Sequence, residues 1–255
     1  MMKKIFLNFL KNKINVYLQC NLYKSAFTLA EVLITLGIIG IVAAMTMPSL
    51  IANYQKKVLE QQAKQAYALL SGIFNKMAAD EEVTDICSTS FISNYPQDDN
   101  EAYTSYLPQT LGKYIEITGN YVCNDSSDKK CFIKYLKSSN SGDGNIEDYW
   151  LFLKNGMKMN IMMDRNVNYW GRLIVDVNGD KAPNTWGRDV FYWHIKCDDS
   201  SSSIYPRAGM VYANGNSNDY WKTTGKWDLK CSTTEVSLGS GCTARLMENG
   251  WVMDY

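Results

Sequence analysis

The feature that most constrains the fold of this chain is an apolar run near its start. Residues 27–51, FTLAEVLITLGIIGIVAAMTMPSLI, contain a single charged side chain, that of Glu31. A helix needs about 20 mostly apolar residues to cross the hydrocarbon core of a bilayer. The run is therefore long enough to form a membrane-spanning helix, and most of the 255-residue chain follows it.

Basic residues gather before this run. Residues 1–26 contain five lysines and no acidic residue, although the whole chain is balanced at 26 basic and 26 acidic residues. Because lysines that flank a span stay in the cytoplasm, we expect a cytoplasmic N-terminus and an extracytoplasmic body after about residue 52. The zero net charge gives no indication of a nucleic-acid partner.

The number and position of the cysteines indicate that the body of the chain lies in an oxidising compartment. Six of the seven follow the apolar run, and an even number predicts three disulfides. A zinc site is disfavoured, because the chain has no Cys-x-x-Cys and a single histidine, His194. Short loops favour two pairs, although other connectivities stay open. The favoured pairs are Cys123–Cys131 and Cys231–Cys242, and the remaining cysteines of the set are Cys87 and Cys197.

The junction between the basic and apolar segments resembles a known processing signal. Residues 24–48, KSA followed by FTLAE and VLITLGIIGIVAAMTMP, resemble the prepilin signature of type IV pilins and type II secretion pseudopilins. The resemblance implies cleavage between Ala26 and Phe27 by a prepilin peptidase, followed by N-methylation of Phe27. Counted from Phe27, Glu31, Gly40 and Pro48 stand at positions that the family commonly uses. Ala26 replaces the usual glycine, which predicts slower processing.

Glu31 is costly inside a membrane. A carboxylate in the hydrocarbon core costs about 2.5–3.5 kcal/mol on insertion scales, and no Lys or Arg lies within one turn of it. In the resembled families the partner is the free amine of a neighbouring subunit, here that of Phe27. The alternative is a plain anchor in which Glu31 snorkels or stays protonated.

After the apolar run, the pattern predicts an amphipathic helix. From Leu59 to Met77 apolar residues recur every three to four positions, and the helix is expected to end near residues 80–84. Pro48 should kink or locally melt it. We thus expect a basic leader at 1–26, a transmembrane half-helix at 27–51, an amphipathic half at 52–83 and a globular head at 84–255.

The head reads as an antiparallel sheet. A hairpin is expected where residues 149–154 meet residues 157–164 across Asn155-Gly156, with further strands at Arg172–Val177 and Val190–Ile195. Residues 87–148 are expected to be a long connection with little regular structure. The predicted fold class is α+β, with a long N-terminal helix packed on a small sheet of three to four strands and disulfide-stapled loops. The tail, residues 197–255, should fold over that sheet.

One loop carries a candidate metal site. Oxygen-bearing side chains at alternate positions present ligands in calcium loops. Lys181 and Gly187 depart from that pattern, at its sixth and twelfth positions. Two interpretations stay open, a calcium site or an Asx-turn loop held by its own hydrogen bonds. The ammonium of Lys181 is a further candidate for the cation's place. The candidate ligands are Asp176, Asn178, Asp180 and Asp189.

No motif of an active site is present. All seven tryptophans fall between Trp150 and Trp251, where packing is a more usual role than sugar or nucleobase binding. We therefore expect a structural subunit of a type IV pilus or type II secretion pseudopilus. Its expected partners are other pilin or pseudopilin subunits, the prepilin peptidase and an inner-membrane assembly platform. The alternatives are an adhesin that binds sugar or DNA, and a membrane-anchored domain that does not polymerise.

Overall fold

The computed structural model describes most of the chain after the basic leader. The described residues are 27–84, 86–96, 100–123, 131–137, 144–145, 149–163, 171–198, 201–206, 231–233, 239 and 241–255. Contacts divide the chain into two compact units, Met1–Ile51 and Ala52–Tyr255.

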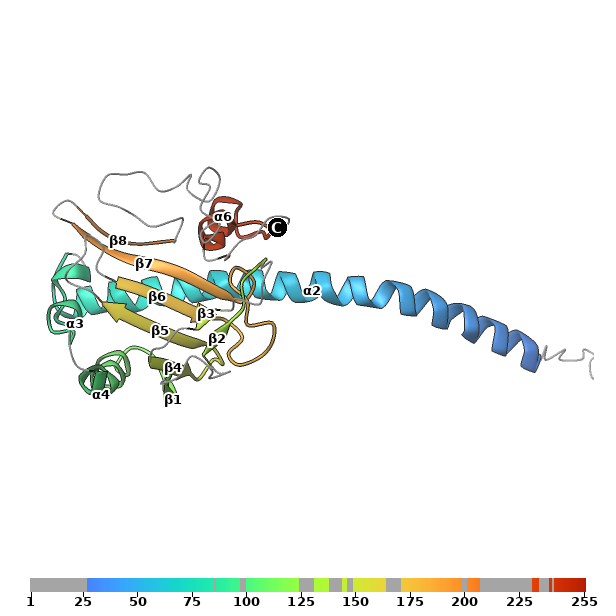
Figure 1. The fold of residues 1–255 in the computed structure, drawn as a ribbon, viewed down its shortest axis with the longest axis horizontal. Helices are drawn as coiled ribbons and strands as arrows, with labels where there is room; N and C mark the ends of the chain where they lie inside the picture. Colours follow the sequence, from blue (N-terminus) through green and yellow to red (C-terminus); the bar gives the residue numbers. More distant parts are fainter. Residues whose placement is uncertain are drawn as a thin grey trace, which may run out of the picture. The chain divides into compact units, whose positions relative to one another are not determined.

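After one long helix, short helical segments come first in the head, the strands follow, and a last short helix ends the described elements (Figure 1). The helical elements are α2 (Leu29–Asp80), η1 (Ile86–Ser88), α3 (Ser90–Ser93), α4 (Asn100–Leu111) and α6 (Cys242–Glu248). The strands are β1 (Ile117–Val122), β2 (Phe132–Ile133), β3 (Gly144–Asn145), β4 (Tyr149–Leu153), β5 (Lys158–Met163), β6 (Gly171–Asp176), β7 (Val190–Asp198) and β8 (Ser201–Pro206).

Helix α2 ends where its sequence predicts. The N–H of Val83 donates to the carbonyl of Ala78 at 2.9 Å, and the N–H of Glu82 donates to that of Ala79 at 3.2 Å. Glu82 has a φ of 54°, so the chain leaves the helix through a left-handed residue. Pro48 lies inside α2 with helical residues on both sides, so the expected local melting does not occur.

The main sheet is antiparallel and has six strands in the order β1-β4-β5-β6-β7-β8. The predicted hairpin is present. Its turn, residues 154–156, is closed by the N–H of Leu153, which donates to the carbonyl of Met157 at 2.9 Å. Gly156, with φ 87°, takes the left-handed position of this turn. The fold class is α+β, as predicted, but the sheet is larger than the expected three to four strands.

The main core lies between the sheet and the second half of α2 (Figure 1). Because side chains alternate across a strand, strands β4, β5, β6 and β7 send every second residue into this core. The buried apolar side chains of α2 are Ala63, Ala66, Leu70, Ile73, Phe74 and Met77, and those of β6 and β7 include Leu173, Val175, Phe191 and Trp193. A smaller cluster covers the opposite face with Trp150, Ile174, Trp186, Val190 and Tyr192.

The expectation of little regular structure in residues 87–148 is wrong. This region contains α4, whose Leu107 and Leu111 are fully buried in the main core, and the edge strand β1. Polar residues and Pro108 make the helix hard to predict from the sequence, since few of its residues are apolar. β8 lies in the segment 197–255, for which the sequence pattern predicts no strand, since the first three residues of β8 are serines.

Candidate functional site

The first residues of α2 are held by Thr28 and Glu31. The backbone N–H and the hydroxyl of Thr28 each donate to Oε2 of Glu31 at 2.8 Å, and the N–H of Glu31 donates to the Thr28 hydroxyl at 3.2 Å. Such a reciprocal capping box satisfies backbone donors that a helix start otherwise leaves unpaired. Among the described residues, no hydrogen bond or ion pair occupies the second carboxylate oxygen, Oε1.

The large apolar side chains in the first half of α2 are exposed in the part of the chain that the structure describes. Phe27 is 84% exposed, Leu29 80% and Met45 77%. Among the described residues, α2 is the one helix long and apolar enough to cross a membrane. A surface of this size on a soluble monomer would drive association, so it fits membrane anchoring. Gly40 and Pro48 lie within α2, while Ala26 lies outside the described residues.

In the head, the candidate calcium loop surrounds a lysine from a neighbouring strand. Lys158 of β5 pairs in register with Asp176 of β6. Its ammonium lies 3.3 Å from Oδ2 of Asp176 and 3.0 Å from Oδ1 of Asp180. The side chains of Lys158 and Asp176 are only 3% and 1% exposed. The ammonium also lies 5.2 Å from the centre of the Trp150 ring, at cation–π distance.

Asp189 closes the other end of this loop. Its Oδ1 accepts the N–H of Thr185 at 2.6 Å, and its Oδ2 accepts the N–H of Asn184 at 2.8 Å. The side-chain amide of Asn178 donates to the same Oδ2 at 3.2 Å. Both oxygens of Asp189 are therefore occupied by N–H donors of the loop itself.

Burial dominates the ionisation of both buried loop carboxyls. It raises the pKa of Asp176, and the adjacent Lys158 ammonium opposes this shift by favouring the carboxylate. Burial also raises the pKa of Asp189, while the N–H groups of Thr185 and Asn184 oppose this shift. Burial thus favours the neutral form of each carboxyl, and its polar partners favour the charged form.

This donor set does not fit a calcium ion. Asp176 and Asp180 face an ammonium, and Asp189 is taken up by backbone donors. Among the residues that the structure describes, no three His, Cys, Asp or Glu side chains form a group able to hold a metal. The sequence suggests Lys181 as an internal cation, but Lys181 is exposed, and the ammonium that contacts Asp176 and Asp180 is that of Lys158. The sequence signal that points to Lys158 is a single lysine at the start of a strand, KMNIMM, that has no other charged residue.

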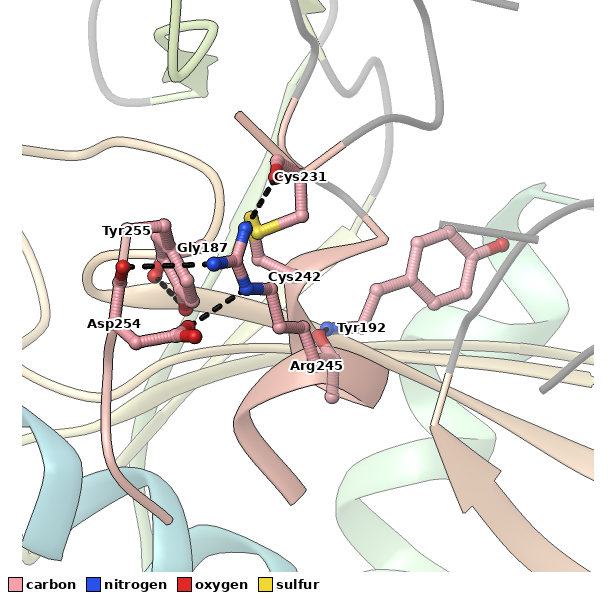
Figure 2. Close-up of a disulfide and its surroundings, with 8 residues drawn as sticks. Gly187, Tyr192, Cys231, Cys242, Arg245, Asp254 and Tyr255 are labelled. Atoms are coloured by element: carbon pink, nitrogen blue, oxygen red, sulfur yellow. Dashed lines mark hydrogen bonds and ion pairs between the residues drawn. A yellow bond between two sulfur atoms is a disulfide. The ribbon is translucent and has the colours of Figure 1, made fainter. Parts of the chain in front are cut away.

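Arg245 joins the last residues of the chain, 252–255, to the Cys231–Cys242 disulfide (Figure 2). These four residues are called the C-terminal tail below. Its Nε donates to Oδ1 of Asp254 at 2.7 Å, and its Nη1 donates to the carbonyl of Cys231 at 2.9 Å. The guanidinium carbon lies 5.4 Å from the centre of the Tyr255 ring, and the Tyr255 hydroxyl donates to the carbonyl of Gly187 at 2.6 Å. The tail is thereby tied to α6 and to the loop between β6 and β7.

The tail also borders a pocket beside α2. This pocket has a volume of about 430 Å³. The side chains of α2 on one wall are Ala52, Gln55, Lys56 and Leu59, and the opposite walls are Ala182, Pro183, Arg188, Met253 and Tyr255. The tail, the β6–β7 loop and the start of the head's helical segment therefore meet at one place.

The structure contains the two disulfides that short loops favour. Cys123 bonds to Cys131 and Cys231 bonds to Cys242, with Cα–Cα distances of 6.0 and 4.8 Å. Cys87 is disulfide-bonded as well. The side chain of Cys197, the sixth cysteine of the expected set, lies outside those described.

Comparison with known proteins identifies the N-terminal segment. A family model of the prokaryotic N-terminal methylation motif matches residues 22–47. None of the curated proteins and none of the solved structures matches the chain. The matched motif is the signature of type IV pilins and pseudopilins, so the chain carries the N-terminal segment of that class. Proteins with this motif are structural subunits rather than enzymes.

Proposed function

We propose that this chain is a structural subunit of a type IV pilus or a type II secretion pseudopilus. The observation that carries the proposal is the methylation motif at residues 22–47, placed where the apolar half of α2 begins. A prepilin peptidase removes the leader between Ala26 and Phe27, and Phe27 is then N-methylated. The exposed apolar half of α2 serves first as a membrane anchor and then as the packing surface between subunits.

The geometry of Glu31 supports assembly through the processed terminus. Oε2 is held by Thr28, while Oε1 remains open to a partner from outside the described chain. Cleavage creates a new amine on Phe27, four residues before Glu31 in the sequence. In hydrocarbon a carboxylate and an ammonium stabilise each other strongly, because neither is solvated there. The Phe27 amine of one subunit therefore pairs with Glu31 of the next and sets the stagger between them.

The membrane topology follows from the two ends of the span. The five lysines of residues 1–26 hold the leader in the cytoplasm. The head contains two described disulfides, which form in an oxidising compartment. The head therefore lies outside the cytoplasm, in the periplasm before assembly and on the filament afterwards.

Mass spectrometry of the N-terminal peptide, from native membranes or sheared filaments, tests this proposal. A chain that begins at N-methylated Phe27 is the expected result. An intact leader would identify a plain anchor, and a start near Met45 would identify an ordinary secreted protein. The variant Ala26→Gly provides a matched comparison. It restores the glycine that the family usually has before the cut, so its processed fraction should equal or exceed that of the natural chain.

A role as a sugar- or DNA-binding module has no support in the described residues. Trp150, Trp186 and Trp193 are at most 5% exposed and pack within the two core clusters. Trp251 is half-buried against the main core and contacts Tyr67, with ring centres 5.7 Å apart and ring planes tilted by 43°. The described tryptophans thus contribute packing area.

A further inference from the structure

The strongest feature outside the processing segment is the buried ammonium of Lys158. A lysine is rarely buried unless it is paired, because removing an ammonium from water costs several kcal/mol. Lys158 is 2% exposed as a whole residue. It lies between two carboxylates of the β6–β7 loop and against the face of Trp150.

We propose that the Lys158 ammonium is the built-in cation of the β6–β7 loop, in the place where loops of this sequence pattern hold a divalent metal. The head therefore folds and remains stable without calcium. This inference concerns the head alone and does not depend on the proposed filament function.

Two contacts carry the proposal. The ammonium neutralises Asp176, whose side chain is nearly inaccessible to water and would be unstable there as an unpaired carboxylate. It reaches Asp180 at 3.0 Å, two residues beyond the bend of the chain at Asn178. It therefore joins the end of β6 to the loop that follows, which is how a metal ion organises such a loop.

The rest of the loop is arranged around this cation. Asp189 binds loop N–H groups instead of facing the ammonium. Gly179, with φ 73°, lets the loop approach the β4–β5 turn so closely that a Cβ there would lie 2.6 Å from the carbonyl oxygen of Gly156. Strand β5 and its turn thus supply both the cation and the surface on which the loop rests.

The first test uses the natural full-length chain in detergent micelles. Its thermal unfolding is followed by circular dichroism in excess EDTA and in millimolar CaCl₂. A bound calcium ion at 100 times its Kd would stabilise the folded state by about 2.7 kcal/mol, a shift of roughly 5–10 °C in Tm. The proposal predicts the same Tm in both conditions. A Tm several degrees higher in calcium would overturn it.

The second test removes the ammonium. Lys158→Met keeps the length and apolar stem of the side chain but leaves Asp176 buried without a cation, so Tm should fall by roughly 10 °C. The matched control is Lys154→Met. Lys154 follows β4, close to the same turn, and pairs with Glu116 at 2.7 Å, but its side chain is 67% exposed, so its loss should change Tm little.

Adding calcium to the variants tests whether Lys158 acts in place of a metal ion or only as a buried ion-pair residue. Millimolar CaCl₂ should restore a measurable part of the Tm lost in Lys158→Met, because Asp176, Asp180 and the loop amides then lack a resident cation. Lys154→Met should show no such recovery. If calcium does not raise the Tm of Lys158→Met, Lys158 is an ordinary buried ion-pair residue and the proposal fails. If Lys158→Met yields no folded protein, the comparison of EDTA with calcium on the natural chain decides.

Discussion

Oε1 of Glu60 in α2 accepts the backbone N–H of Met253 at 2.8 Å, across 193 positions of sequence. Glu60 is 8% exposed and Met253 is 4% exposed. This bond ties the last residues of the chain directly to the long helix. It works together with Arg245, which holds Asp254 from α6. The tail is therefore part of the head's structure, and several consequences can be measured.

Glu60→Ala should lower the stability of the head. The change leaves the N–H of Met253 buried without an acceptor, which costs about 1–3 kcal/mol. Glu60→Gln retains an acceptor oxygen and should lose less. Urea unfolding of the full chain in micelles measures both changes, and exposed Gln61→Ala on the same helix is the control. Equal losses in the Ala and Gln variants would show that the hydrogen bond is unimportant.

Asp254 should make tail docking depend on pH. The hydrogen bond from Arg245 is the main reason why the pKa of Asp254 is lowered. A carboxyl with a lowered folded pKa stabilises the fold above its unfolded pKa of about 3.9, and this contribution is lost as pH falls through the folded pKa. Because the Asp254 side chain is 46% exposed, the contribution is below about 1 kcal/mol. Comparing Asp254→Asn with the natural chain at pH 7 and near pH 2 should show a stability difference only at pH 7.

Glu31 variants should distinguish helix capping from pairing between subunits. Glu31→Gln keeps an oxygen that can accept from Thr28 but removes the negative charge. If Glu31 pairs with the Phe27 amine of a neighbour, both Glu31→Gln and Glu31→Ala should abolish filaments at normal membrane levels of the protein. Shearing followed by immunoblotting measures assembly. Filaments in Glu31→Gln at natural abundance would show that the cap, rather than the charge, is required.

Loss of the Cys231–Cys242 disulfide should loosen the tail. The bond closes a loop with a sequence separation of 11, for which removal costs about 2–4 kcal/mol. The carbonyl of Cys231 also accepts from Arg245, so tail contacts should weaken as well. A Cys231→Ser and Cys242→Ser double variant should show faster hydrogen exchange at Met253 than Cys123→Ser with Cys131→Ser. Equal hydrogen exchange at Met253 in the two variants would show that the Cys231–Cys242 disulfide does not hold the tail in place.

Local sequence patterns determined much of this protein. The 25 residues from Phe27 to Ile51 define a membrane-length helix by composition alone, and the motif around them defines the class of protein. The helix end near Asp80 and the hairpin at Asn155-Gly156 were also predictable. Each depends on residues close together in sequence, whose backbone preferences act before any distant contact forms.

Tertiary structure decided the remainder. α4 and β1 lie in a polar stretch, and they are stabilised by contacts with α2 and β4 that local propensity does not reveal. Lys158 meets Asp180 only because β5 and β6 pair in one register, and Glu60 meets Met253 only after the sheet packs on the helix. Burial makes these distant contacts strong, since a charge or N–H removed from water needs a partner. That partner is chosen by the packing of the whole head, so the spacing of residues along the chain does not reveal it.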